Sequence, residues 1–478
     1  MELEAAKKLI KDHMPSHTEF IVKADVGERY YCNDNDILHR EKNKTSSGEK
    51  KEENPLRSAD NRIPFNFHGT LVNQKASYMF TYPPLIDVGK KEINKKISKL
   101  LGNKFAKVCK KLCVNASNTG IAWLHYWRDK KGDFKYGVVD SRQIIPIWTD
   151  DQESELKAVL RTYNKVLDNG KTYIIYEIWT EEQCEAFAQE VENQEIWIYY
   201  SIINRRIIDI ETEEGNIYEH DWERVPFIPF MNNDMQTNDL LNIKRLIDCY
   251  DRVYSGFMDD LEDIQEIIFV LSGYGGTELK EFIQDLKKYK AVKLDADEAN
   301  PGLSTLTINI PVEAREKMLA MTRKSIFEQG QGVDPQPENY GNASGEALKF
   351  MYTLLELKAG LMETEFRISI DEFVSAICKE LNTEPEKINQ TWTRNMIRSE
   401  KELSDMCASS REVVSKKTIL KNHPFVEDVE EELKQIQKEE EESSQKEEQQ
   451  MYGNAFGNKT KTESPEDEEL MKKKQAAE

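Results

Sequence analysis

The sequence predicts an α+β protein built from several folding units, and three observations support this prediction. The chain has 478 residues, which is more than one hydrophobic core usually serves. Apolar residues follow a strand-like period in one part of the chain and a helical period in others. Two long helical stretches also enclose a short mixed segment, which indicates a stalk that carries a small module.

Residues 1–238 form the first predicted unit, of mixed helix and strand. Residues 42–54 are polar and charged, which is typical of a surface loop. Apolar residues at three- and four-residue spacings predict a helix over residues 92–115. Strand-like runs and a tight turn at Asn169-Gly170 then predict a curved antiparallel sheet with a flanking helix. These runs are residues 121–127, 134–139, 158–166, 172–179, 195–203 and 206–210.

The pattern becomes helical at Asp239 and predicts a first long helix over residues 239–272, about 45 Å in length. A glycine-rich stretch ends this helix. Residues 273–310 then predict a small module with one amphipathic helix and strands near residues 291–294 and 303–310. Pro311 suits the first turn of a second long helix, residues 311–329.

The remaining chain alternates loop and helix. Residues 330–345 contain four glycines and two prolines, which predicts a loop. Ser344 caps a third helix that occupies most of residues 346–398 and runs to about Glu380. Residues 399–441 are predicted to be helical and highly charged. Residues 442–478, rich in Glu, Lys and Gln, predict a disordered acidic tail.

Composition restricts the possible functions. The net charge is -21 and the pI is near 5.0, which argues against a tight grip on DNA, because duplex DNA is bound mainly through Lys and Arg. No run of about 18 apolar residues is present, so we expect no membrane association. Seven scattered cysteines and an N-terminus unlike a secretory signal suit assembly in a reducing cytosol.

No catalytic constellation is evident, and we expect neither enzymatic activity, nor a cofactor, nor a metal. The sequence has no GxxxxGK phosphate loop, no HExxH motif and no nucleophile elbow. Cys109 and Cys113 lie four residues apart on a predicted helix, but further zinc ligands are missing nearby. We therefore interpret both as buried thiols. His125, between Leu124 and Tyr126, is interpreted as a residue of the sheet.

Three sequence runs point to one known family. The most specific covers residues 326–352, IFEQGQGVDPQPENYGNASGEALKFMY. Asn61-Arg62-Ile63 and residues 220–233, HDWERVPFIPFMNN, support it. In these runs the chain resembles portal proteins of long-tailed, siphophage-type bacteriophages. The order of the predicted elements agrees with that family over about residues 55–435.

The resemblance implies a portal-type architecture with a wing, a two-helix stem, a small α/β clip and a helical crown. In chain order the parts would be residues 1–238 (wing), 239–272 (first stem helix), 273–310 (clip), 311–329 (second stem helix), 330–345 (tunnel loop), 346–398 (wing helix and return), 399–441 (crown) and 442–478 (acidic tail).

The resemblance also implies a function. Portal proteins form rings, typically homododecamers, that conduct DNA at one capsid vertex during genome packaging, head–tail joining and DNA ejection. The implied partners are double-stranded DNA, the terminase large subunit, head-completion or adaptor proteins, and the major capsid and scaffolding proteins. The protein would be assembled in the host cytoplasm and reside in the virion. Because the chain has no motor motif, an external ATPase would drive packaging.

Two groups of site residues follow from the resemblance. The clip residues expected at the docking surface for terminase or adaptors are Lys280, Lys287, Lys288, Lys290 and Lys293. The loop residues expected to face DNA are Gln331, Gly332, Val333, Asp334, Pro335, Gln336, Glu338, Asn339 and Tyr340. This loop carries amides and two carboxylates without Lys or Arg. Such a wall would let DNA slide, because it makes no strong phosphate contacts.

Two other function classes fit the composition. One is a non-viral oligomeric scaffold whose acidic tail recruits partners. The other is a metal-dependent nucleotidyl- or phosphoryl-transfer enzyme with a site built from carboxylates. Ring formation by the purified protein would distinguish the portal from both, and a divalent-metal-dependent activity would favour the enzyme.

Overall fold

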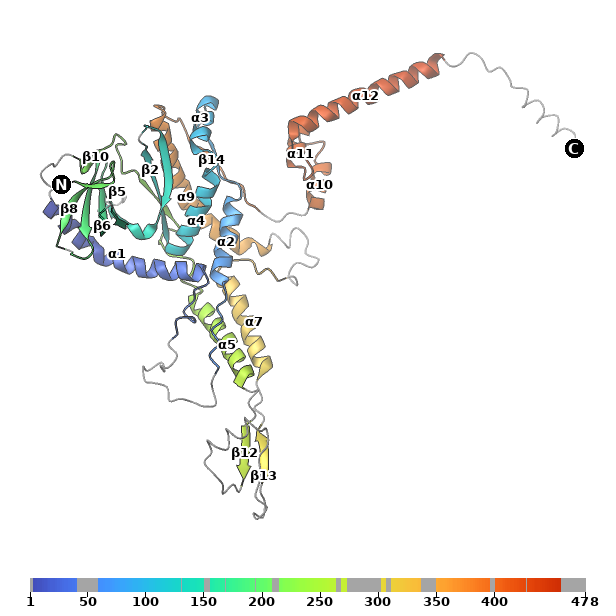
Figure 1. The fold of residues 1–478 in the computed structure, drawn as a ribbon. Coiled ribbons are helices and arrows are strands. Elements are labelled where there is room, and N and C mark those ends of the chain that lie inside the picture. Colours follow the sequence, from blue (N-terminus) through green and yellow to red (C-terminus); the bar gives the residue numbers. More distant parts are fainter. Residues whose placement is uncertain are drawn as a thin grey trace. The chain divides into compact units, whose positions relative to one another are not determined.

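The computed structural model forms two units, one of residues 1–343 and 347–396 and one of residues 344–346 and 397–478. Both contain helices, and the first also contains sheets, so the α+β prediction is confirmed (Figure 1). The structure describes residues 3–40, 59–129, 131–149, 155–167, 169–193, 195–208, 215–263, 268–272, 302–306, 311–336, 350–395, 400–426 and 428–456.

The first unit contains a large sheet in which every strand is antiparallel to its neighbours. The strand order is β4 (Ile144–Trp148), β5 (Leu156–Val166), β6 (Thr172–Trp179), β7 (Gln183–Glu190), β8 (Trp197–Ser201) and β9 (Arg206–Ile208), with β10 (Ile217–Glu219) also paired to β7. The predicted antiparallel sheet is therefore confirmed. The predicted turn is confirmed too, because Gly170 has a φ of +75° between β5 and β6. Strands β4, β7 and β10 were not predicted.

Helix α1 (Leu3–Tyr31) flanks this sheet. Its Ala6 and Ile10 are buried in a cluster with Leu160 and Phe187 of the sheet. The sequence patterns predicted no helix in this region. Ten of the 29 residues of α1 are charged and Pro15 lies inside the helix, so its short apolar stripe gave a weak signal.

A second sheet lies between the large sheet and a layer of helices (Figure 1). Its strands are β11 (Phe227–Met231), β2 (Ile121–Arg128) and β3 (Phe134–Val139), in that order. Trp123 of β2 and Phe227 of β11 pack with Trp179 of the large sheet. The other face packs against α2 (Phe67–Phe80), α4 (Phe105–Thr119) and α9 (Thr353–Glu380). The predicted strands at residues 121–127 and 134–139 are confirmed.

The single helix predicted over residues 92–115 is wrong. The structure has α3 (Lys91–Leu101) and α4, which are separated at Gly102. Gly102 has a φ of +59°, which glycine adopts at little cost and which ends a right-handed helix. Strand β1 (Leu85–Asp87) precedes α3 and pairs with β14 (Asn389–Thr391).

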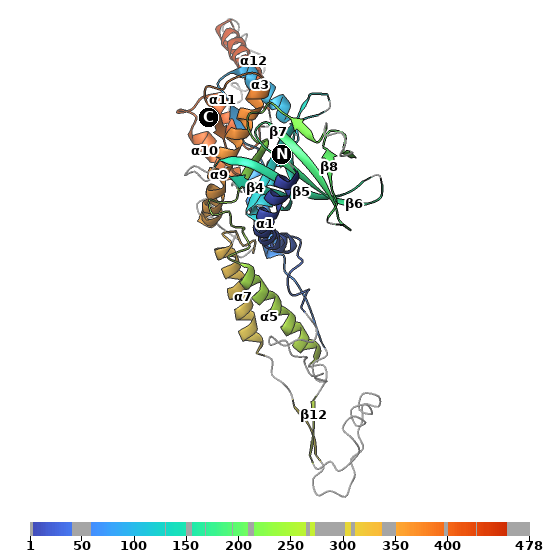
Figure 2. The ribbon, with the colours of Figure 1, turned by 90° about the vertical axis from the view of Figure 1, so that its left-hand side faces the viewer.

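The two predicted stalk helices are α5 (Lys244–Asp263) and α7 (Val312–Gln329), which lie side by side (Figure 2). The prediction of one helix over residues 239–272 is wrong at both ends, since residues 239–243 form turns and residues 268–272 form a strand. Helix α5 has 20 residues, about 30 Å, and β12 (Ile268–Ser272) pairs antiparallel with β13 (Gly302–Leu306). The run from Ile267 to Leu271 is continuously apolar, so its period could not separate strand from helix.

The second unit contains α10 (Glu400–Ser409), α11 (Lys416–Asn422) and α12 (Val429–Phe456). The prediction that residues from 442 onward are disordered is wrong up to Phe456. Glu, Gln and Lys are strong helix formers, and Lys416 and Lys417 of α11 pair with Glu440 and Glu430 of α12. Among the described residues of both units, no helix combines the length and apolar character that a membrane crossing needs.

Candidate functional site

The predicted DNA-facing loop begins directly after α7, and its first six residues are described. Gln331, Gly332 and Asp334 are half-buried, while Pro335 and Gln336 are exposed. Val333 is buried in the main core, so it cannot contact DNA as expected. Glu338, Asn339 and Tyr340 lie outside the described residues, as do Lys280, Lys287, Lys288, Lys290 and Lys293 of the predicted clip.

The side-chain amide of a glutamine in α2 hydrogen-bonds both backbone groups of Val333. Gln74 donates from Nε2 to the Val333 carbonyl at 2.7 Å and accepts from the Val333 amide at 3.0 Å. Gly332 permits this approach, because a Cβ at that position would collide with Leu71 and with the Gln74 amide. The start of the loop is therefore fixed to α2.

Asp334 is paired with a cation that loop composition did not reveal. Arg323 of α7 donates from Nε and Nη2 to the two carboxylate oxygens of Asp334, at 3.0 and 2.6 Å. This two-point hydrogen bond raises the pKa of the Arg323 guanidinium, which also lies 5.3 Å from the ring centre of Phe327. The loop lacks Lys and Arg in sequence, but in space its first carboxylate is neutralised by Arg323 of α7.

A buried ionic cluster underlies this loop. The Asp239 carboxylate lies 2.6 Å from the Lys75 ammonium and 3.2 Å from the Lys358 ammonium. Lys75 also donates to Asn232 at 2.7 Å, and Asn232 in turn donates to Asp239 at 2.9 Å. The three charged side chains are at most 10% exposed. A buried charge is tolerated only when it is paired and hydrogen-bonded.

The cluster connects four parts of the fold. Lys75 comes from α2, Asp239 precedes α5, Lys358 belongs to α9, and Lys358 donates to the Gly330 carbonyl at 2.9 Å. Burial alone would raise the pKa of Asp239, but Lys358 and Lys75 hold the pKa of its carboxyl well below the ordinary value. Burial lowers the pKa of Lys358. Lys358 thus links the end of α7 to α9. Through the Asp239 carboxylate it also links both to α2 and to the segment before α5.

The motif Asn61-Arg62-Ile63 lies in an extended segment that runs alongside α5. Its backbone amides at Asn61, Ile63 and Phe65 donate to Asp259, Ser255 and Asp251, at 2.6, 3.0 and 3.0 Å. Every second residue of the extended segment thus meets every fourth residue of the helix. The spacings match, because two extended residues span about 6.6 Å and four helical residues about 6 Å.

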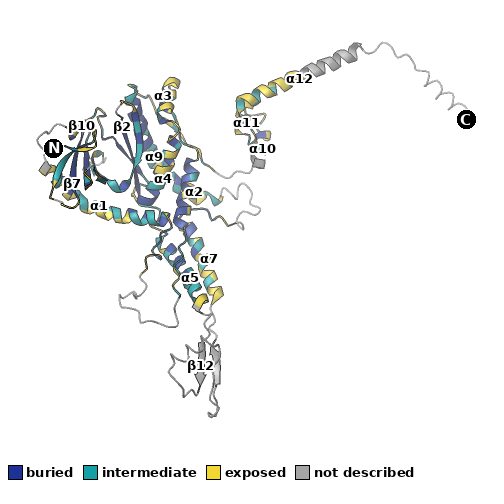
Figure 3. Ribbon diagram, viewed as in Figure 1, coloured by how far each residue is buried: buried dark blue, intermediate teal, exposed yellow. Residues whose placement is uncertain are grey.

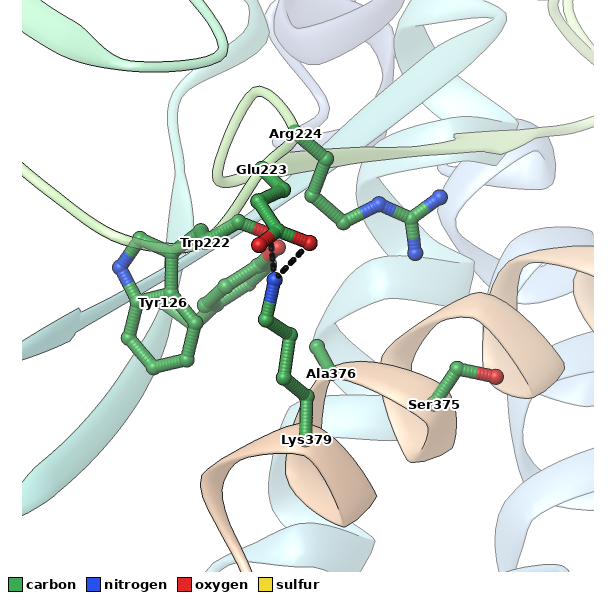
Figure 4. A pocket seen from close by; sticks show the side chains of 7 residues that line it. All are labelled: Tyr126, Trp222, Glu223, Arg224, Ser375, Ala376 and Lys379. Carbon is green, nitrogen blue, oxygen red and sulfur yellow. Dashed lines mark hydrogen bonds and ion pairs between the residues drawn. The ribbon is translucent and has the colours of Figure 1, made fainter. Parts of the chain in front are cut away.

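One cavity, of about 310 Å³, lies between α9 and the loop that precedes β11. Its lining residues are Tyr126, Trp222, Glu223, Arg224, Ser375, Ala376 and Lys379 (Figure 4). Lys379 pairs with Glu223 at 2.7 Å and donates to the Trp222 carbonyl at 3.1 Å, and Arg224 pairs with Glu372 at 3.1 Å. These contacts tie the loop to α9, and the lining holds no nucleophile next to a base.

The candidate metal and histidine positions have structural roles. Cys109 and Cys113 are buried in α4, as interpreted from the sequence, and burial raises the pKa of the Cys113 thiol to about 11. His125 lies in β2 and shares a hydrogen bond of 2.8 Å with the Pro226 carbonyl, which confirms its place in the sheet. Within the described ranges, no three His, Cys, Asp or Glu side chains are placed to hold a metal ion.

Comparison with known proteins decides between the function classes. The family described as "Phage portal protein, SPP1 Gp6-like" matches residues 10–446. The chain belongs to the phage portal protein family. It is 42% identical over 448 residues to a portal protein of Clostridium phage phiCD119, covering 90% of this chain and 94% of the relative. It is 29% identical over 451 residues to the portal protein of Bacillus phage SPP1, covering 91% and 85%.

Family membership confirms the resemblance seen in the sequence. The portal protein is a structural, non-enzymatic virion component of a bacteriophage, and its role is that of a DNA channel in genome packaging and ejection. The interpretations as a non-viral scaffold or as a phosphoryl-transfer enzyme are set aside.

Proposed function

We propose that copies of this portal protein close into a ring at one capsid vertex, and that the outer face of α9 is part of the contact between neighbouring subunits. The observation that supports this most directly is an apolar stripe on that face. Its members repeat at helical spacing and are 37–65% exposed; they are Leu354, Leu357, Leu361 and Ile368. The opposite side of α9 packs in the main core through Leu355, Met362 and Phe366.

In the second half of α9, the loop before β11 covers the outer face. There the outer positions are polar, and the loop at Glu223 and Arg224 covers them by pairing with Lys379 and Glu372. The first half carries leucines instead, and a Cβ at Gly360 in its middle would meet nothing within 4 Å. An uncovered apolar helix face of this length marks a protein–protein contact.

A second copy of the chain suits this face better than an unrelated partner. Closed rings need a contact between two different patches, one on each side of the subunit. Obligate contacts of that kind are as apolar as a domain core.

The double substitution Leu357→Asp with Leu361→Asp tests this proposal. Both side chains are exposed in the subunit, so the fold should lose little stability, while ring closure should be lost in native mass spectrometry. Val166→Asp is the matched control, because Val166 is 64% exposed on β5, and it should leave rings intact. Rings of unchanged size in the double variant would show that the α9 face is not the contact.

We further propose the family's division of labour for the parts of this chain. Residues 1–238 and 346–398 form the wing, α5 and α7 with their flanking residues form the stem, residues 273–310 form the clip and residues 399–441 form the crown. Duplex DNA passes the loop after Gly330. The terminase large subunit, and later head-completion proteins, dock at the clip lysines. Capsid and scaffolding proteins surround the ring as it assembles in the host cytoplasm.

The contacts at the start of the loop support a shorter DNA-facing part than the sequence suggested. The residues before Pro335 are held by α2 and α7, so the proposed DNA-facing part starts at Pro335 and Gln336. Gln336→Lys should slow packaging of DNA in an in vitro reaction and leave ring assembly intact, because a cation on the wall adds a phosphate contact. Equal losses of packaging and assembly would contradict a role in the channel.

A further inference from the structure

Helices α3 and α4 carry a concentration of positive charge that the proposed channel does not use. Residues 90–111 contain nine lysines and one glutamate, a net charge of +8 in a chain whose total is -21. The lysines are Lys90, Lys91, Lys95, Lys96, Lys99, Lys104, Lys107, Lys110 and Lys111. We call this surface the α3–α4 lysine ridge.

All nine lysines of the ridge are exposed, and Figure 3 shows most of α3 as exposed. The apolar residues of the two helices, such as Ile97, Phe105 and Leu112, pack in the main core. The lysines therefore lie on the sides of α3 and α4 that face away from the core.

Few acidic side chains neutralise the ridge. Lys95 pairs with Glu92, Lys90 with Glu386 at 3.8 Å, and Lys111 interacts with Asp140. Lys104 donates to the Tyr136 carbonyl at 2.9 Å. Within the part of the chain that the structure describes, the others have no ion pair; they are Lys91, Lys96, Lys99, Lys107 and Lys110.

This arrangement weakens the isolated subunit. Lys91, Lys95 and Lys99 follow one another at four-residue spacing, as do Lys107 and Lys111, and like charges at that spacing destabilise a helix by about 0.2–0.5 kcal/mol per pair. A polyanion bound along the ridge would remove this repulsion. The exposed positions of residues 90–111 include no Arg and no aromatic side chain, so the ridge suits contacts to a phosphate backbone and not the reading of bases.

We propose that the α3–α4 lysine ridge binds the backbone of duplex DNA, independent of sequence, outside the channel. This rests on the proposed function, which brings duplex DNA to the ring. DNA that slides through a channel is better served by weak phosphate contacts, so the ridge acts on duplex that lies against the outer surface. An acidic protein segment is the less favoured occupant, since α12, the most acidic helix described, already pairs its Glu430 and Glu440 with lysines of α11.

A covalently closed circular plasmid separates the ridge from the channel, because circular DNA cannot thread through a closed ring. Purified full-length protein would be titrated into such a plasmid at low and moderate NaCl. The test variant carries Lys96→Gln, Lys107→Gln and Lys110→Gln. The control variant carries Lys8→Gln, Lys11→Gln and Lys157→Gln, which removes the same charge from exposed lysines elsewhere.

We expect the test variant to bind the plasmid at least about tenfold more weakly at low salt. Its slope of log affinity against log salt should be shallower by about 2 to 3, because each phosphate contact contributes about 0.9. The control variant should bind within about twofold of the native protein. Equal losses in the two variants, an unaffected test variant, or a native protein that does not bind circular DNA would each overturn the proposal. Particle mass, measured in parallel, reports ring formation separately, so failure of the ridge leaves the ring proposal standing.

Discussion

At the scale of single residues, the carboxylate of Asp239 balances the buried positive charge next to the start of the loop. It is the counter-charge for two buried ammonium groups, Lys75 and Lys358, so the cluster has one more positive than negative charge. Lys358 also carries the hydrogen bond to Gly330. Loss of the one acidic residue therefore leaves two buried charges unpaired, whereas loss of Lys358 leaves the other two residues paired.

This inequality predicts an order of stabilities. Asp239→Asn leaves two ammonium groups buried without a counter-charge and should lower the free energy of unfolding by about 3–5 kcal/mol. Lys358→Met keeps the pair of Lys75 and Asp239 and should cost less, about 1–3 kcal/mol, mainly through the lost hydrogen bond. Urea unfolding of both variants measures the difference. The account fails if Lys358→Met is the more damaging change.

A second residue-scale prediction concerns pH and Asp251. Burial raises the pKa of this carboxyl from 3.8 to about 6, although Asn35 and Phe65 donate hydrogen bonds to it. Between these two values the native state binds more protons than the unfolded chain, so the contribution of Asp251 to stability falls as pH rises through that window.

Asp251→Asn removes this dependence, because an amide does not ionise. The new amide has an acceptor nearby, since Asn35 Oδ1 has no hydrogen-bond partner within the described residues. Relative to the native protein, the variant should gain on the order of 1–2 kcal/mol between about pH 5 and about pH 7.5. Urea midpoints at the two pH values give this difference, and a difference that stays constant with pH would contradict the assignment.

At the scale of elements, the start of the loop is the point where α2, α7 and α9 meet. Gln74→Leu removes both hydrogen bonds to Val333 and should cost about 1–3 kcal/mol, because half-buried backbone groups lose their partners. Hydrogen exchange of residues 331–336 should become faster, while exchange in the core side of α9 stays unchanged. Asn73→Ala, at the exposed neighbouring position of α2, is the control and should leave loop exchange unchanged.

Local patterns predicted the elements whose signal is local. Helix α7, strands β2 and β3 and the turn at Gly170 follow from period and turn residues. The strand at Ile268–Ser272 and the break at Gly102 were missed, because a short apolar run and a single glycine fit a helix as well. The clamp on Val333 joins residues 259 positions apart, and no local pattern reports such a pair.

The site illustrates the same limit. Sequence placed the start of the loop correctly, since residues 331–336 follow α7 without helix or strand; the rest of the predicted loop lies outside the described residues. It could not show that Val333 is core or that Arg323 neutralises Asp334, because both depend on how α7 and α2 pack. The α3–α4 lysine ridge, in contrast, is visible in the sequence as nine lysines among residues 90–111. The net charge of the whole chain, which is -21, does not reveal this local excess of positive charge.

At the scale of the whole molecule, the chain combines an α+β unit, which includes the two long helices α5 and α7, and a charged helical unit. The acidic total charge suits a conduit in which DNA slides. Positive charge is concentrated in the α3–α4 lysine ridge. The outer face of α9 exposes apolar side chains to solvent in the single subunit. These features are consistent with a subunit whose surface is completed only by assembly.

The central claim is that this portal protein closes into a ring. Electron microscopy of the purified full-length protein, combined with native mass spectrometry over a range of salt concentrations, tests it most directly. The account predicts closed rings with a central channel and one uniform subunit number. Monomers alone at every salt concentration, or open chains of variable length, would contradict it.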